Sequence, residues 1–347
     1  MSTVVAVVLL LAIAAYAVFG GADFGAGFWD LTAGGPERGA APRERIEHSI
    51  APVWEGNHVW LIFILVVTWT AFPEVYQSIW LTMFVPLTIA ALGIVLRGAS
   101  FAFRKSVTSL RFRRIFGGGF ALSSVLVPFC FGAVAGGIAS GQVPGGGRAG
   151  DPVESWLNPM SVVTGLLAVA MAAYLAAVYL VWDSRGADEQ GLTEYFRRRA
   201  VVTAVVSAVL AVAGLVVAHD KASHVYDRLT SQALPVVVVS ILCGIGALVL
   251  LVRDAARGAR LLAVAAVGLV VVAWGVAQWP YLLPESVTVD DAAAPSGTLG
   301  ALGVAVVIAV LVVLPGFLLL YTLARRGLLP EEGVDDSGDH SLGGTRG

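Results

Sequence analysis

The chain has 347 residues, of which 57% are hydrophobic and 13% are charged, about half the charged fraction of an average soluble protein. A formal net charge of −2 gives no indication of nucleic-acid binding. Cys130 and Cys243 both lie in apolar segments, so no disulfide framework is indicated. This composition predicts an all-α integral membrane protein with no large soluble domain between its apolar segments.

Nine apolar segments are long enough to span a bilayer, which takes roughly 17–25 residues each. Because the bilayer core holds no water for unpaired backbone groups, we expect each segment to be an α-helix. The first begins without a basic region and is too long for the core of a signal peptide, so we expect no cleavage. In chain order the predicted spans are Val4–Phe28, Val53–Phe72, Ile79–Phe103, Ile115–Ala139, Trp156–Trp182, Ala200–Ala218, Leu234–Val252, Leu261–Trp279 and Leu299–Leu323.

Positive charge alternates strongly between the connections. Of the 22 Lys and Arg residues, 18 lie after spans one, three, five and seven or in the C-terminal tail. The connections after even-numbered spans hold only Arg148, Lys221 and Arg228, and Arg97 lies inside span three. The positive-inside rule therefore predicts an outer N-terminus and a cytoplasmic C-terminus.

The connections are short, so consecutive spans should be antiparallel neighbours. We expect one polytopic domain over residues 1–330, followed by a polar, Gly-rich and disordered cytoplasmic tail over 331–347. Within the domain, residues 1–140 and 156–279 should form two four-helix bundles, with the ninth helix at 299–323 peripheral to both. The longest outer segments, Gly141–Ser155 and Pro280–Gly297, should be irregular.

Ionisable side chains inside membrane spans are costly, and they mark functional sites. Asp23 lies in span one, Glu55 and His58 lie at the start of span two, and Arg97 lies near the end of span three. Glu55 and His58, three residues apart, share one helix face. At about 1.5 Å of rise per residue, all four fall in the cytoplasmic half of the first bundle.

Two interpretations of this cluster stay open. In the first, Glu55, Asp23 and His58 conduct protons from the cytoplasm, since carboxyl groups near an aqueous entrance exchange protons. In the second, Asp23 or Glu55 forms a structural ion pair with Arg97, and His58 is a structural histidine. The glycines around Asp23 permit close helix packing.

The sequence does not favour a haem or metal site in this chain. Axial haem ligation needs inward-facing His, Met or Cys residues at matched depths, and His58 is the only histidine predicted inside the membrane. The methionines Met83, Met160 and Met171 are unpaired and suit a filling role in the core. No Walker motif and no cluster of metal-ligating residues is present.

The N-terminal hundred residues resemble subunit II of the cytochrome bd quinol oxidases, a family that includes the cyanide-insensitive oxidases. The second half resembles the family in hydropathy, and Trp279-Pro280-Tyr281 fits its pattern after span eight. Nine spans and an outer N-terminus also match. The motifs that carry the resemblance are G-G-A-D-F-G at Gly20–Gly25, W-E-G-N-H-V-W at Trp54–Trp60, W-T-A-F-P at Trp69–Pro73, and Leu96-Arg97 with Phe103-Arg104-Lys105.

This resemblance implies a haem-free subunit of a terminal oxidase in the bacterial cell membrane. The partner, subunit I, would carry two haems b, one haem d and the quinol site. In the family the acid at the position of Glu55, Asp in some members, belongs to a proton route, while Asp23 matches an acid of undefined role. Trp54 matches a motif tryptophan linked to quinone binding or stability. A small accessory single-span subunit, a bound quinone and lipid are further partners that the resemblance allows.

Two other functions fit the same residues. A proton-coupled transporter would also carry intramembrane Asp, Glu and Arg, but it should have broken helices and a polar site at the midplane. The midplane here is nearly all Ala, Val and Leu. A purely structural scaffold for the haem-bearing subunit would lack a proton route altogether.

Overall fold

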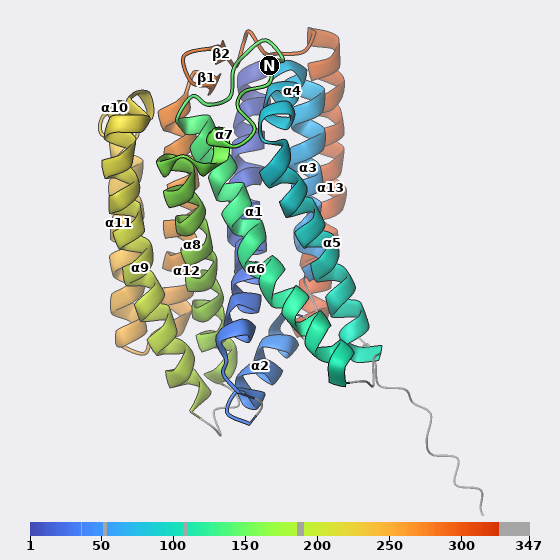
Figure 1. Ribbon diagram of the computed structural model, residues 1–347, viewed down its shortest axis with the longest axis vertical. Helices are drawn as coiled ribbons and strands as arrows, with labels where there is room; N and C mark the ends of the chain where they lie inside the picture. The colour runs from blue at the N-terminus through green and yellow to red at the C-terminus, as the bar shows by residue number, and fades with distance from the viewer. Residues whose placement is uncertain (36, 51–53, 107–109, 186–190, 326–347) are drawn as a thin grey trace, which may run out of the picture.

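The structure is a computed structural model that describes residues 1–325 apart from 36, 51–53, 107–109 and 186–190. Apart from one small hairpin, the regular secondary structure of the described chain is helical (Figure 1). The predicted tail at 331–347 lies outside the described residues. We call the end of the molecule that carries Met1 the upper end, and the opposite end the lower end.

Long helices run between these two ends. Among the described residues, seven helices are long and apolar enough to cross a membrane, and α3 reaches that standard only when joined to α4. The apolar part of α5, Phe84–Ser100, is shorter. The long helices are α1 (Ser2–Thr32), α3 (Trp54–Ala71), α5 (Phe84–Ser106), α6 (Leu110–Ala139), α8 (Pro159–Ser184), α9 (Leu192–Lys221), α11 (Leu234–Val252), α12 (Ala256–Gln278) and α13 (Ser296–Arg325).

Short elements lie between the long helices. They are α2 (Ala40–Ile50), α4 (Pro73–Thr82), α7 (Glu154–Leu157), α10 (Ser223–Leu229), β1 (Tyr281–Leu283) and β2 (Val287–Thr288). The strands pair antiparallel, with Tyr281 opposite Thr288. The expectation that Gly141–Ser155 and Pro280–Gly297 are irregular therefore holds for most of each segment, but not for α7 or the hairpin.

The predicted start of span three at Ile79 is wrong. Ile79 lies in α4, which bends 118° away from α3, and the next long helix starts only at Phe84. The bend between α3 and α4 has a local cause: Pro73 occupies the first turn of α4, and a residue before proline avoids the helical region, as Phe72 does with φ −135° and ψ 61°. At its other end α4 stops at Met83, whose φ of −96° and ψ of 21° separate it from α5.

The predicted start of span five at Trp156 is also wrong, because the chain breaks at Asn158. Asn158 has extended backbone angles, and its side chain accepts a hydrogen bond from the backbone N–H of Ser161. Pro159 then occupies the first turn of α8, a position that proline suits. The predicted seventh span, in contrast, matches α11 at both ends.

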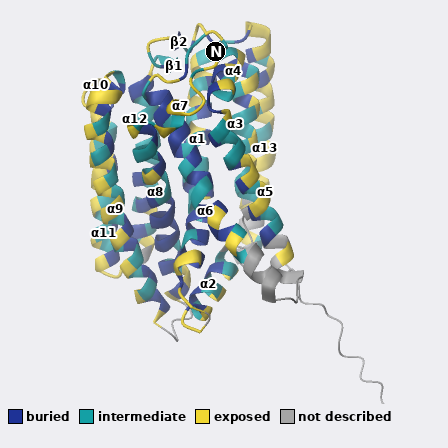
Figure 2. Cartoon of the chain, in the orientation of Figure 1, coloured by how far each residue is buried: buried dark blue, intermediate teal, exposed yellow. Residues whose placement is uncertain are grey.

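The core of the molecule lies along α8, which packs against α9, α6 and α1. Figure 2 shows buried residues concentrated on α1, α6 and α8, and exposed residues on α9, α11 and α13. Small residues allow the close approach of α1 and α8: a Cβ added at Gly25 would lie 1.9 Å from the carbonyl oxygen of Ala172. The helix α13 contacts mainly α3.

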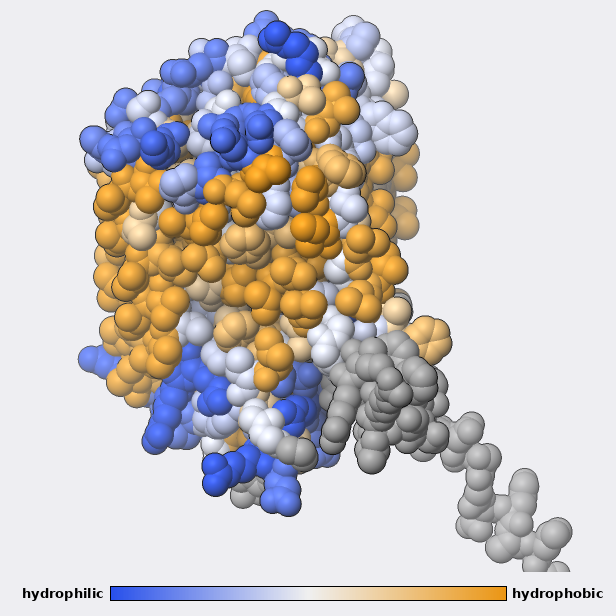
Figure 3. Space-filling view, viewed as in Figure 1, coloured by the Kyte–Doolittle hydropathy of each residue, from blue (hydrophilic) through white to orange (hydrophobic). Residues whose placement is uncertain are grey.

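Hydropathy divides the surface into layers. In Figure 3 an apolar band surrounds the middle of the visible face, and polar residues gather at the two ends. The helix order brings the connections rich in Lys and Arg, such as the one that contains α2, to the lower end (Figure 1). At the upper end, a segment between α6 and α7 is fastened to α4. The backbone N–H groups of Gly146, Gly147 and Gly150 donate to Glu74, Ser78 and Thr82 respectively.

Candidate functional site

Arg97 is the centre of a buried polar cluster, and its side chain is only 1% exposed. Its Nη2 donates at 2.8 Å both to the carboxylate Oδ1 and to the backbone carbonyl oxygen of Asp23. Its Nη1 donates to the hydroxyl oxygen of Ser124. A single guanidinium on α5 therefore joins α1 and α6.

Two aromatic rings complete the surroundings of this guanidinium. Its central carbon lies 5.0 Å from the ring centroid of Phe24 and 4.2 Å from that of Phe120. A cation within about 6 Å of a ring face is attracted by the ring quadrupole, more strongly when water is excluded. The cluster is thus enclosed by α1, α5 and α6, and it has one carboxylate for its one cation.

The ion pair is not fully hydrogen-bonded. The side chain of Asp23 is 3% exposed, and its Oδ2 has no hydrogen-bond partner among the described residues. The same holds for Nε of Arg97. A buried polar atom without a hydrogen-bond partner carries an uncompensated desolvation cost. This ion pair is therefore not a strong source of stability.

The helical motif Trp54–Trp60 lies against α1. The amide of Asn57 donates to the carbonyl oxygen of Phe19 at 3.3 Å, and the ring of Trp60 stacks on that of Phe19 at 6.5 Å. The ring of His58, which is half-buried, lies 6.2 Å from the ring of Phe24. Since the guanidinium of Arg97 lies over the ring of Phe24, this ring lies beside both His58 and the buried ion pair.

The structure brings some of the sequence-predicted residues together. It pairs Asp23 with Arg97, which the sequence had left open between Asp23 and Glu55, and it places His58 beside Phe24. Trp54 and Glu55 fall in the first turn of α3, but their side chains lie outside the described residues.

Sequence reasoning missed three neighbours of Arg97, namely Ser124, Phe24 and Phe120. A signal existed for the first: Ser123 and Ser124 are adjacent hydroxyl residues in an otherwise apolar segment, where polar side chains need a partner. The two phenylalanines gave no such signal, because apolar residues are the rule in these helices.

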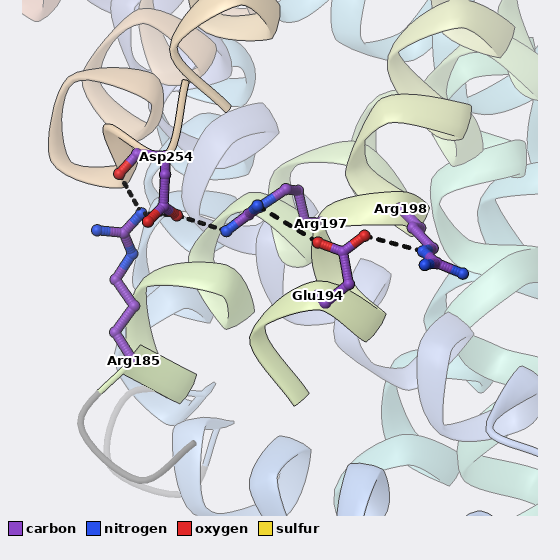
Figure 4. Close-up of polar contacts among 5 residues, drawn as sticks. All are labelled: Arg185, Glu194, Arg197, Arg198 and Asp254. Atoms are coloured by element: carbon purple, nitrogen blue, oxygen red, sulfur yellow. Dashed lines mark hydrogen bonds and ion pairs between the residues drawn. The ribbon is translucent and has the colours of Figure 1, made fainter. Parts of the chain in front are cut away.

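A second set of charges lies at the lower end, on the surface (Figure 4). Asp254 accepts from Arg185 at 2.6 Å and also from Arg197. Glu194 pairs with Arg197 at 3.3 Å and with Arg198 at 2.9 Å. This network joins the end of α8, the start of α9 and the connection between α11 and α12. Because both acids are exposed and the arginines are at least partly exposed, each pair contributes little stability.

We compared the described residues with the requirements of a metal or haem site. Within the described chain, no three His, Cys, Asp or Glu side chains gather as a metal site. His58 packs beside the ring of Phe24, and Met83 and Met160 are buried in apolar clusters. The absence of haem from this chain stays a prediction.

These features define a class: an all-helical, multi-pass membrane protein with charges buried between helices. The family model for cytochrome bd terminal oxidase subunit II matches residues 1–324, and the chain belongs to this family. It is therefore a subunit of a quinol oxidase, an oxidoreductase complex of the bacterial membrane that contains haem in its partner subunit, subunit I.

Relatives support the same assignment. A protein of Bacillus subtilis (strain 168), provisionally named a cytochrome bd menaquinol oxidase subunit II, is 23% identical over 321 residues, which cover 90% of this chain and 92% of the relative. Cytochrome bd-I ubiquinol oxidase subunit 2 of Escherichia coli (strain K12) is 27% identical over 177 residues, covering 48% of this chain and 44% of that protein.

The fold has a solved counterpart. A chain in the structure of bd oxidase from Geobacillus thermodenitrificans superposes with a TM-score of 0.74 at 24% identity, covering 95% of this chain and 99% of that chain. At this level of identity the match supports the fold alone.

Proposed function

We propose that this chain is the haem-free subunit II of a cytochrome bd-type quinol oxidase, and that Glu55 receives protons from the cytoplasm for the reduction of oxygen in subunit I. The observation that carries the assignment to Glu55 is the buried pair of Asp23 and Arg97. Of the two carboxyl groups in the predicted cluster, one is already bound to the buried cation.

The pair fits a positioning role for Asp23. Its carboxylate and its backbone carbonyl oxygen both accept from Arg97, and a proton on the carboxylate would leave the buried Arg97 without its counter-ion. Removing one partner of a buried ion pair leaves an uncompensated charge, which is strongly unfavourable. We therefore assign Asp23 and Arg97 to holding the helices that surround the route.

Glu55 has the features that a proton relay needs. It lies in the first turn of α3, near the lower end where the basic connections lie, and one helical turn before His58. Carboxyl and imidazole groups at such positions form the proton relays of membrane proteins. His58, beside the ring of Phe24, is the next group along this face and the candidate to follow Glu55.

Substitution of Glu55 tests this proposal. Glu55→Gln keeps the size and hydrogen bonding of the side chain but removes the exchangeable proton. Oxygen consumption by the purified complex at saturating quinol should fall at least about tenfold, since a positioned acid–base group contributes on the order of 100-fold or more to a rate. The haem spectra should stay unchanged, and Glu55→Asp should keep most of the activity.

Two other outcomes would contradict the proposal. Loss of haem or assembly in step with activity would assign Glu55 a structural role, as the scaffold alternative requires. Normal turnover with normal assembly would eliminate Glu55 from both roles. Family membership leaves the alternative of a proton-coupled transporter without support.

We further propose that two haems b and one haem d, with the quinol site, belong to subunit I. Trp54 is the candidate to support a bound quinone or local stability, and a small accessory subunit and lipid are further candidate partners. His58→Ala in the complex should then leave the haem absorbance spectrum and the pyridine haemochrome yield at wild-type values. Loss of one haem would show that His58 is an axial ligand.

The proposed topology has nine spans, an outer N-terminus and a cytoplasmic C-terminus. It counts α3 and α5 as spans beside the seven helices that are long and apolar enough by themselves. Residues 1–140 and 156–279 would form two bundles that share the contacts of α8 with α1 and α6, and α13 would be peripheral.

A further inference from the structure

Two arginines at the lower end are stacked on aromatic rings. Arg257 and Arg260 lie in the first turns of α12, three residues apart and therefore on one helix face. Their guanidinium carbons lie 5.2 Å and 5.3 Å from the ring centroid of Trp182 in α8, and that of Arg260 lies 5.6 Å from Tyr179. Both guanidinium groups are thus held against the ring of Trp182.

Nearby acids neutralise these two charges only in part. In the described chain, neither arginine has a carboxylate oxygen within 4.0 Å. Asp254, the acid nearest in sequence, is bound to Arg185 and Arg197 (Figure 4). Asp183 faces Arg260, but it also faces Arg45 and His48. The site therefore keeps a net positive charge.

The surroundings of the arginines are those of a membrane surface. Trp182 and Tyr179 lie in the last turns of α8, where aromatic side chains mark the level of lipid headgroups. On the same helical hairpin, Val252 at the end of α11 and Leu261 in α12 are each 65% exposed. The two guanidinium groups thus lie next to exposed apolar side chains, against which the acyl chains of a lipid can pack.

We propose that Arg257 and Arg260, held on Trp182, bind the phosphate of an anionic phospholipid headgroup from the leaflet at this end of the molecule. Guanidinium groups match phosphate oxygens with paired hydrogen bonds. Free inorganic phosphate shares that chemistry, but it makes no use of the exposed Val252 and Leu261. Basic sites between helices at the cytoplasmic side commonly take such headgroups.

Lipid binding to the complex with subunit I tests the proposal. The complex is stripped of lipid, and native mass spectrometry then follows the addition of phosphatidylglycerol or phosphatidylcholine with the same acyl chains. Wild type should bind one phosphatidylglycerol more tightly than phosphatidylcholine. Arg257→Gln/Arg260→Gln should weaken that binding about tenfold to thirtyfold, the effect of removing two headgroup-level charges.

The matched control removes the same charge at the same end. Arg38 and Arg198 are exposed, and neither stacks on an aromatic ring in the described chain. Arg38→Gln/Arg198→Gln should therefore bind phosphatidylglycerol as wild type does. As a second variant, Trp182→Leu removes no charge but removes the ring, and it should also weaken binding.

Several results would overturn the proposal. They are equal binding of the two lipids by wild type, unchanged binding in the Arg257 and Arg260 variant, or an equal loss in the control. Displacement of phosphatidylglycerol by inorganic phosphate, compared with chloride at the same ionic strength, would identify a phosphate site rather than a lipid site. Because binding is the readout, the result does not depend on whether Glu55 carries protons.

Discussion

Asp23 and Arg97 each stabilise the charged form of the other. Each side chain is almost fully buried, and each is the other's counter-ion. Replacing both members of a buried pair with apolar residues is often tolerated, whereas removing one leaves an unpaired charge at a cost of about 3–5 kcal/mol. The two changes should therefore not be additive.

Variants of this pair measure that dependence. Arg97→Met alone should sharply lower the yield and the melting temperature of the complex, because the carboxylate of Asp23 loses its cation. Asp23→Leu/Arg97→Met should recover part of both values. An additive loss in the double variant would contradict the coupling. Normal assembly of the double variant without oxygen consumption would instead place Asp23 on the proton route.

At the scale of elements, the contact between α1 and α8 depends on the absence of side chains. At Gly25 an added Cβ would meet backbone atoms of Ala172 and Ala173 at 1.9–2.8 Å, and backbone cannot rotate away. At Gly21, one helical turn earlier, the nearest atoms would be 3.9 Å away. The same substitution should therefore have opposite effects at these two positions.

Gly25→Ala should force α1 and α8 apart and destabilise the protein by about 1–3 kcal/mol or more, the usual cost of overpacking. Gly21→Ala should be neutral or stabilising, since alanine favours helix formation over glycine. Both variants gain the same helix propensity, so the difference in melting temperature between them isolates the packing effect. Equal melting temperatures would show that the helices can separate without cost.

The long helices were predictable because their hydropathy depends on sequence alone. The predicted span Leu234–Val252 agrees with α11 residue for residue. The break at Met83, before α5, was missed because apolar residues continue from Ile79 into α5, and the break before α8 was missed although Pro159 marks it. For the site, counting residues from the ends of the spans predicted that Asp23 and Arg97 lie at a similar depth in the membrane. Their pairing needed the rotation of each helix about its axis, which hydropathy does not determine.

At the scale of the whole molecule, basic connections lie at one end and the N-terminus at the other (Figure 1). Fusions test how this polarity relates to the membrane. An alkaline phosphatase reporter inserted near Gly146 should be active, as expected outside the cell, and one fused after Arg325 should be inactive. A green fluorescent protein at the same two positions should give the reverse pattern. The same signal at both positions would contradict the odd number of spans that we predict between Gly146 and Arg325.

The burial of α8 has a consequence for how this protein changes over evolutionary time. Its central residues Ala172, Ala173, Ala176 and Ala177 are buried, so a larger side chain there displaces a neighbouring helix. Exposed positions of α9 and α11 need only remain apolar. Substitutions should accumulate on these outer helices and spare the centre, so that relatives with low overall identity keep the same arrangement of helices around α8.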